Sequence, residues 1–113
     1  MDNFNRGDVW LAKWAKNTLD GRIEARPAII ASNAGYNAEN DEVICLHLTT
    51  NTKHEYALSL NDNDFEKNLM VDKSAVRFDI IARHSKNSLV KKLAVLKKSK
   101  LEQAVAKTIG LIK

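Results

Sequence analysis

The chain has 113 residues, enough for one domain with a single buried core and too few for two. Its 44% hydrophobic and 28% charged residues are typical of a globular protein and exclude a disordered chain. No apolar run reaches the length of a membrane span, and the N-terminal residues lack the pattern of a secretion signal. We therefore expect a cytoplasmic protein with a single domain over residues 1–113.

The net charge of +4 is distributed unevenly along the chain. Residues 83–113 carry nine Lys/Arg and one acidic residue, Glu102, a balance of +8, whereas residues 1–82 carry nine Lys/Arg and thirteen Asp/Glu, a balance of −4. A basic segment of this kind fits a polyanion or an acidic protein segment as partner. Equally, its lysines could only solvate the outer face of a helix and a strand.

The first half of the chain predicts three short strands. Residues 8–14 alternate like a strand, and Pro27 is expected to begin a second strand, because proline is tolerated at a first strand position. Arg26 would then stand where a loop enters that strand. The stretch 42–50 is continuously apolar, which is typical of a central strand, and we expect Cys45 within it to pack as a small hydrophobic residue.

The second half predicts three more strands and a terminal helix. The strands are expected over residues 54–60, 74–81 and 91–96, with a break in the pattern at 61–67. Ser99 and Glu102 have the spacing of a capping box, and an apolar stripe at helical spacing follows, made of Leu101, Val105, Ile109 and Ile112. The pattern indicates a mainly β fold, a small curled antiparallel barrel with the C-terminal helix packed on it.

The sequence lacks the motifs of several large enzyme classes. His47, His54 and His84 have no metal-binding spacing, and a single cysteine cannot build a thiolate site. A nucleophile elbow, a Walker loop and a dinucleotide fingerprint are also missing, so we expect no metal and no other cofactor. For His47, inside the predicted central strand, a hydrogen-bonded structural role is favoured over a catalytic one.

Polar residues at the strand ends are the remaining candidates for a site. Arg26 precedes the second strand, and Thr49 ends the third. An arginine holds a phosphate through two parallel hydrogen bonds, and a threonine hydroxyl adds another donor. Arg77 and Asp79 are two residues apart and share a face of their strand, but this spacing alone favours a surface ion pair.

Four segments carry a family resemblance: "RGDVWLA" (6–12), "RPAIIASN" (26–33), "VICLHLTT" (43–50) and "AVRFD" (75–79). In this order they resemble the MazF/PemK (Kid) toxins of prokaryotic toxin–antitoxin systems, over essentially the whole chain. The resemblance implies a small SH3-like antiparallel barrel with a C-terminal helix, the fold shared by CcdB-like and MazF-like toxins.

The resemblance also implies an activity, that of a sequence-preferring, metal-independent endoribonuclease of the mRNA interferase type. Such an enzyme cleaves single-stranded RNA by attack of the ribose 2′-oxygen and leaves a cyclic phosphate and a 5′-hydroxyl. By this likeness Arg26 and Thr49 are active-site residues, and Arg77 and Asp79 match a catalytic Arg-x-Asp pair. We infer that Asp79 accepts the proton, because arginine is a poor base.

The partners implied are single-stranded RNA, a second copy of the chain in a homodimer, and a cognate antitoxin with a flexible acidic tail. Trp14 is a candidate anchor for that tail, whereas Trp10 is expected in the core. The loop before Arg26, "LDGRIEA", lacks a histidine that many relatives carry there. Contacts to RNA are expected from the following residues: Arg22, Thr50, Arg83 and His84.

Two other functions stay open at this point. A CcdB-like gyrase poison would have the same fold, but that resemblance involves a C-terminal Trp-Gly-Ile, and this chain ends in "TIGLIK". A barrel that binds RNA or protein without catalysis is the second alternative. The presence of Arg26, Thr49, Arg77 and Asp79 favours the nuclease over this second alternative.

Overall fold

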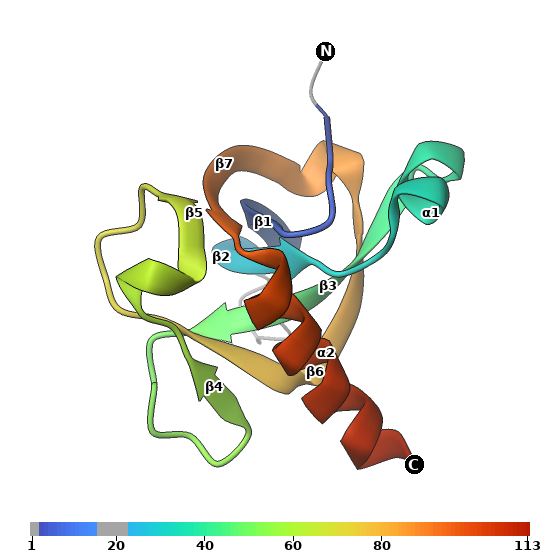
Figure 1. Cartoon of the computed structure of the whole chain (residues 1–113). Helices are drawn as coiled ribbons and strands as arrows, with labels where there is room; N and C mark the ends of the chain where they lie inside the picture. The colour runs from blue at the N-terminus through green and yellow to red at the C-terminus, as the bar shows by residue number, and fades with distance from the viewer. Residues whose placement is uncertain (1–2, 16–22) are drawn as a thin grey trace.

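The computed structural model describes residues 3–15 and 23–113, and its core is a curled antiparallel sheet of seven strands (Figure 1). The strand order is β4-β6-β3-β2-β1-β7-β5. The elements in chain order are β1 (Asp8–Ala15), β2 (Ile23–Ile30), α1 (Ala34–Glu39), β3 (Glu42–Thr49), β4 (Ala57–Ser59), β5 (Phe65–Asn68), β6 (Ala75–Ser85), β7 (Leu89–Leu96) and α2 (Lys98–Ile112). The predicted mainly β fold with a C-terminal helix is confirmed. Within the described ranges, no helix is long and apolar enough to cross a membrane.

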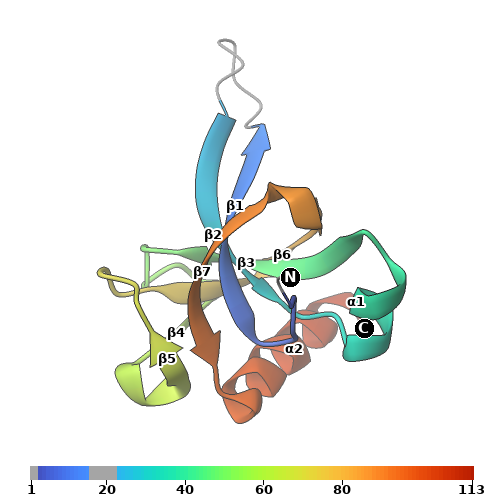
Figure 2. The same cartoon turned by 90° about the horizontal axis from the view of Figure 1, so that it is seen from above.

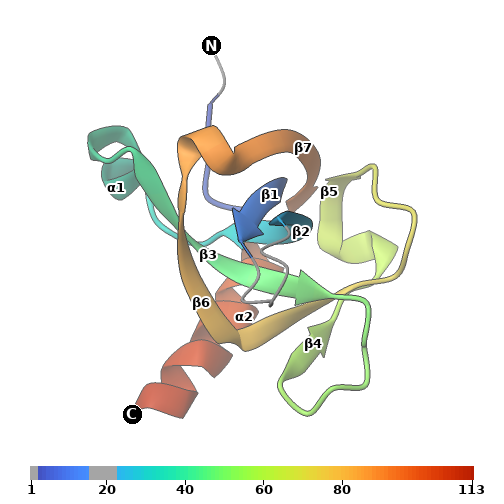
Figure 3. The same ribbon diagram turned by 180° about the vertical axis from the view of Figure 1, so that it is seen from behind.

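The sheet curls because its long strands bend. Figure 3 shows β6 turning sharply as it passes β3, and Figure 2 shows β1 and β2 extending together away from the rest of the sheet. The bend in β6 coincides with a break in its ladder to β3: Leu46 lies opposite Ile81, but His47 lies opposite Arg77. Residues 78–80 are thus left over on β6, which is a bulge, and bulges increase local twist and bend a strand.

The two faces of the curled sheet pack into two separate apolar clusters. On one face Val9, Ile29, Leu46 and other strand residues pack against Leu101 of α2. The other face lines the inside of the curl, with members that include Trp10, Ala28, Ile30, Val43, Cys45 and Leu89. Because β3 is covered on both faces, its sequence is apolar without alternation, and its predicted central place is confirmed. The expected burial of Trp10 and Cys45 is confirmed as well.

The prediction that Pro27 begins a strand is wrong. Pro27 is the fifth residue of β2, where it lies opposite Leu11 of β1. Its missing N–H is tolerated there because the ladder from β2 to β3 starts only at Ala28. Arg26 therefore lies within a strand and not at the entrance to one.

The capping box predicted at the start of α2 is also wrong. The N-cap is Lys97, which makes no side-chain cap, and Ser99 lies inside the helix. The backbone holds this end instead, since the Lys97 N–H donates to the carbonyl of Asp64 at 2.8 Å. Glu102 faces Lys98 at 4.0 Å, a pair one helical turn apart.

Helix α2 packs against the sheet from its start as far as Thr108. The buried Thr108 hydroxyl donates to the carbonyl of Phe78 in β6 at 2.6 Å. Beyond it, two residues of the expected apolar stripe are exposed, Ile109 by 47% and Ile112 by 72%, and the neighbouring Leu111 is 48% exposed. The end of the helix therefore presents apolar side chains that this chain alone does not cover.

Other boundaries differ where short elements lack a sequence signal. The strand expected over 54–60 is reduced to β4, because residues 54–56 form a turn. The stretch 61–67, read as a break, contains β5 on the edge of the sheet, and the polar stretch after Ser32 contains α1. The last predicted strand is confirmed as β7, which pairs with both β1 and β5.

Candidate active site

A row of residues crosses the sheet on the face that lines the inside of the curl. Trp10 lies opposite Ala28, Ala28 opposite His47, and His47 opposite Arg77. Side chains of opposed residues in antiparallel strands point to the same face. Arg26 and Thr49 lie two residues further along β2 and β3, so they share that face with His47. The register therefore gathers Arg26, Thr49 and Arg77 around His47.

Arg26 and Thr49 line one groove. Its volume is 430 Å³, and Thr50 and Lys91 also lie along it. The opposite wall is apolar and comes from the segment 69–71 between β5 and β6. In this segment Leu69 is 59% exposed and Val71 98%. This wall was not predicted as part of a site, although three apolar residues in a row within a polar stretch were a signal.

The guanidinium of Arg26 is exposed and paired within its own strand. Its Nη2 donates to Oε2 of Glu24 at 2.8 Å, and its Nε donates to the same oxygen at 3.2 Å. Thr49 Oγ1 accepts a hydrogen bond from the N–H of Asn51 at 3.0 Å. A hydroxyl that accepts in this way keeps its own hydrogen to donate. Arg26 and Thr49 are thus a cation and a hydroxyl donor at the edge of one groove.

Arg77 and Asp79 form a bidentate ion pair, as their spacing predicted. Nε donates to Oδ1 and Nη2 to Oδ2, each at 2.8 Å. The hydrogen bond from Arg77 lowers the pKa of Asp79 and raises that of Arg77, which keeps both groups charged. Neither residue lines the groove with Arg26. In the strand register, however, Arg77 lies opposite His47, which is two residues from Thr49 along β3.

His54 was not predicted as part of a site, yet it lies close to this ion pair. Its Nδ1 accepts a hydrogen bond from the N–H of Tyr56 at 3.0 Å. After Arg77, His54 is also among the groups that lower the pKa of Asp79. An acceptor Nδ1 places the proton of a neutral imidazole on Nε2, where it can be donated. His54 comes from the turn before β4, so its position depends on how that turn folds.

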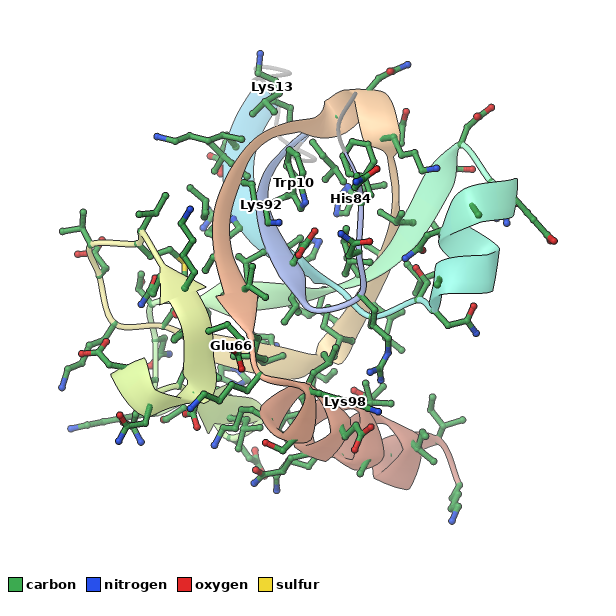
Figure 4. All side chains as sticks on the ribbon, turned by 45° about the horizontal axis from the view of Figure 1, so that its top comes forward. Trp10, Lys13, Glu66, His84, Lys92 and Lys98 are labelled. Atoms are coloured by element: carbon green, nitrogen blue, oxygen red, sulfur yellow. The ribbon has the colours of Figure 1, made fainter. Side chains whose placement is uncertain are left out.

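His47 forms a buried pair with His84. The two Nε2 atoms are 2.9 Å apart, each residue is 5% exposed, and the rings are nearly parallel. Burial, then the nearby His84, then Arg26 lower the pKa of His47 to about 4, so it is neutral at pH 7. The expected burial and hydrogen bond of His47 are confirmed, and its structural role stays a prediction. His84, expected as an RNA contact, lies inside the curl of the sheet near Trp10 (Figure 4).

One further residue predicted to contact RNA, Arg83, is not brought to the groove. Arg83 lies opposite Ile44 and pairs with Glu42 at 3.1 Å, so it is on the other face of β3 from His47. Arg22 lies outside the described residues, as does the side chain of Trp14. Among the residues that the structure describes, no group of three His, Cys, Asp or Glu could hold a metal ion.

Comparison with known proteins identifies the family. The sequence profile of the family described as "PemK-like, MazF-like toxin of type II toxin-antitoxin system" matches residues 5–112. This chain is a PemK/MazF-like toxin. The predicted resemblance is thereby confirmed over nearly its whole length. No curated protein matches the sequence significantly.

Solved structures of MazF proteins and of an endoribonuclease have the same fold. The MazE–MazF complex of Deinococcus radiodurans aligns with a TM-score of 0.78 at 19% identity, over 98% of this chain and 97% of that chain. An endoribonuclease from a mycobacterial species aligns at 0.70 and 22% identity, over 97% and 94%. The toxin MazF-mt6 of Mycobacterium tuberculosis aligns at 0.68 and 21% identity, over 92% and 93%.

Proposed function

We propose that this toxin is a metal-independent endoribonuclease that cleaves single-stranded RNA through its ribose 2′-oxygen. The observation that carries the proposal is that Arg26 and Thr49 line one groove, beside the Arg77–Asp79 ion pair. The first two groups are cationic and neutral donors of the kind that binds a phosphate. A similar toxin structure is that of a mycobacterial endoribonuclease, which supports the same reaction here.

The proposed chemistry divides between the two pairs of residues. Arg26 and Thr49 donate hydrogen bonds to the phosphate oxygens, where negative charge grows in the transition state. Asp79 accepts the 2′ proton as the 2′-oxygen bonds to phosphorus, and Arg77 orients Asp79 while lowering its pKa. The bond from phosphorus to the 5′-oxygen breaks, and that oxygen takes a proton from water. Because both carboxylate oxygens already accept from Arg77, Asp79 uses their remaining lone pairs. Thr50 and Lys91 lie further along the groove and bind the flanking RNA.

No metal is needed in this route, because the 2′-hydroxyl supplies the nucleophile within the substrate. Cleavage of a long RNA should therefore persist in excess EDTA and yield a cyclic phosphate. A requirement for Mg²⁺ would refute this mechanism.

Substitutions test the site directly. Arg26→Ala and Thr49→Val should each reduce cleavage by about 10²-fold or more, the effect of losing one transition-state donor. Lys98→Ala is the matched control, because Lys98 is 85% exposed on α2 and lies outside the groove. Replacement of the target ribose by 2′-deoxyribose should abolish cleavage. Wild-type rates in both site variants would show that the site lies elsewhere, and RNA binding without cleavage would favour a non-catalytic barrel.

The proposal includes a homodimer and an antitoxin. Exposed apolar side chains at the end of α2, namely Ile109, Leu111 and Ile112, support a second copy as their cover. An acidic antitoxin tail that fills the groove would meet Arg26 and Lys91 and could rest on the apolar wall at 69–71. Such a tail should compete with RNA, and added salt should slow its association more than it speeds its dissociation.

A further inference from the structure

A buried pair of imidazoles lies next to the candidate site. His47 and His84 are each 5% exposed, with Nε2 atoms 2.9 Å apart, and they adjoin an apolar cluster that contains Val43 and Cys45. Aliphatic side chains would fill such a space without the cost of burying polar groups. Unlike aliphatic side chains, the two imidazoles form a hydrogen bond that joins β3 to β6.

This hydrogen bond crosses the bulge between β3 and β6. His47 lies opposite Arg77 on one side of the bulge, and His84 lies opposite Val43 on the other side. The leftover residues 78–80 lie between these two stretches of ladder. The bond therefore ties together the two halves of a strand pairing that the backbone leaves interrupted.

The bulge contains the residues that the site needs. Asp79 is one of the leftover residues, and Arg77 is the last paired residue before them. On the far face, Phe78 is held by hydrogen bonds from Thr108 and to the carbonyl of Tyr56. On the near face, the imidazole pair is the corresponding support. A bulge that shifts by even 1 Å would move the carboxylate relative to Thr49, and about 10²-fold in rate can depend on such a shift.

We propose that His47 and His84 are positioning residues of the ribonuclease site, whose hydrogen bond fixes the bulge that presents Arg77 and Asp79 beside Thr49. The inference rests on the proposed function, because the imidazoles act through the Arg77–Asp79 pair. Neither imidazole touches the RNA. The pair therefore positions Arg77 and Asp79, in addition to packing inside the curl of the sheet.

Two substitutions at His84 separate positioning from packing. His84→Leu removes the hydrogen bond and keeps an apolar volume, whereas His84→Gln keeps an amide near the place of Nε2. The control is Val43→Ala, which removes buried volume opposite His84 without touching the bond. Each variant is compared with wild type in thermal unfolding, in the single-turnover cleavage rate at saturating RNA, and in affinity for a 2′-deoxy analogue.

Loss of positioning should appear in the rate and not in the affinity. His84→Leu should slow cleavage by about tenfold or more while RNA affinity changes by less than about threefold. His84→Gln should recover most of the rate, and Val43→Ala should lose thermal stability with its rate unchanged. If His84→Leu cleaves as fast as Val43→Ala, or His84→Gln as slowly as His84→Leu, the pair is only packing and the inference is wrong.

The inference can be judged even if the proposed function fails. If the wild-type protein does not cleave RNA under any condition, the amide ¹H–¹⁵N shifts of residues 77–80 replace the rate as the readout. His84→Leu should move these shifts more than Val43→Ala does, and His84→Gln should restore them. Equal shifts in all three variants would overturn the positioning role independently of catalysis.

Discussion

Acidification should destabilise the fold through His47. Its pKa falls from 6.5 to about 4 on folding because of burial, His84 and Arg26, in that order. In the unfolded chain the imidazole keeps its ordinary pKa, so between these two values the unfolded state binds more protons and stability rises with pH. The stabilising contribution is therefore fully present above pH 6.5 and is lost as the pH falls toward 4.

The expected effect is large for a chain of this size. A lowering from 6.5 to about 4, at 1.36 kcal/mol for each pKa unit, corresponds to about 3 kcal/mol. Burial lowers the pKa of His84 in the same direction. Of the charged groups near the pair, Arg26 opposes the protonation of His47, and Arg77, which lies opposite His47, is paired with Asp79. Asp79 acts at lower pH, since its contribution is lost only as the pH falls below its ordinary pKa of 3.8.

Urea unfolding followed by far-ultraviolet circular dichroism measures the effect, at fixed protein concentration and in steps between about pH 7 and about pH 4. The matched variant is His47→Gln, whose amide does not titrate. Its free energy of unfolding should fall less with acidification than that of the wild type, by about 3 kcal/mol at the acid end. Parallel stability curves for the two proteins would refute the assignment of this pH dependence to His47.

Three further substitutions test other parts of the structure. Leu101 of α2 is only 1% exposed, so Leu101→Ala should lower the free energy of unfolding, measured in urea, by about 2–5 kcal/mol. A loss below about 1 kcal/mol would mean that α2 is not docked as described. Ile112→Asp should halve the mass measured by light scattering while the circular dichroism stays unchanged, and an unchanged mass would contradict a dimer through this end of α2. Asp8→Asn should destabilise by about 1–3 kcal/mol, because Asp8 is 2% exposed and pairs with Lys92 at 3.3 Å; equal stability would show that the pair is neutral overall.

The sequence predicts the fold best where burial leaves a clear pattern. The run around Cys45 is apolar without alternation, and β3 is indeed covered on both faces. Short edge elements leave no such pattern: Phe65 is the sole buried residue of β5, and α1 begins with a cap from Asn33 inside a polar stretch. The capping box predicted at Ser99 failed for a different reason. The helix begins after Lys97, whose N–H donates to the carbonyl of Asp64 in a distant segment, and no local motif reveals this contact.

The site could be predicted in part for the same reason. Arg26 and Thr49 lie at matching places on neighbouring strands, so their shared groove follows from strand pairing, while their catalytic role stays a prediction. The apolar wall at 69–71 joins the groove from a remote loop, which no local pattern reveals. The pairing of His47 with His84 depends on the bulge in β6, and the register across a bulge cannot be read from the sequence.

The two arginines of the proposed site are each neutralised by a carboxylate of their own chain, Arg26 by Glu24 and Arg77 by Asp79. A phosphate that reaches either guanidinium replaces or joins a carboxylate, and the carboxylate then recruits cations from solution. Counterions released from the RNA are thereby partly taken up by the protein, whereas an unpaired cation bound to single-stranded RNA contributes a slope of about 0.7 in log affinity against log salt. RNA binding should therefore respond to ionic strength less steeply than the number of arginines suggests, and the exchange favours ligands whose oxygens compete well with an aspartate or glutamate.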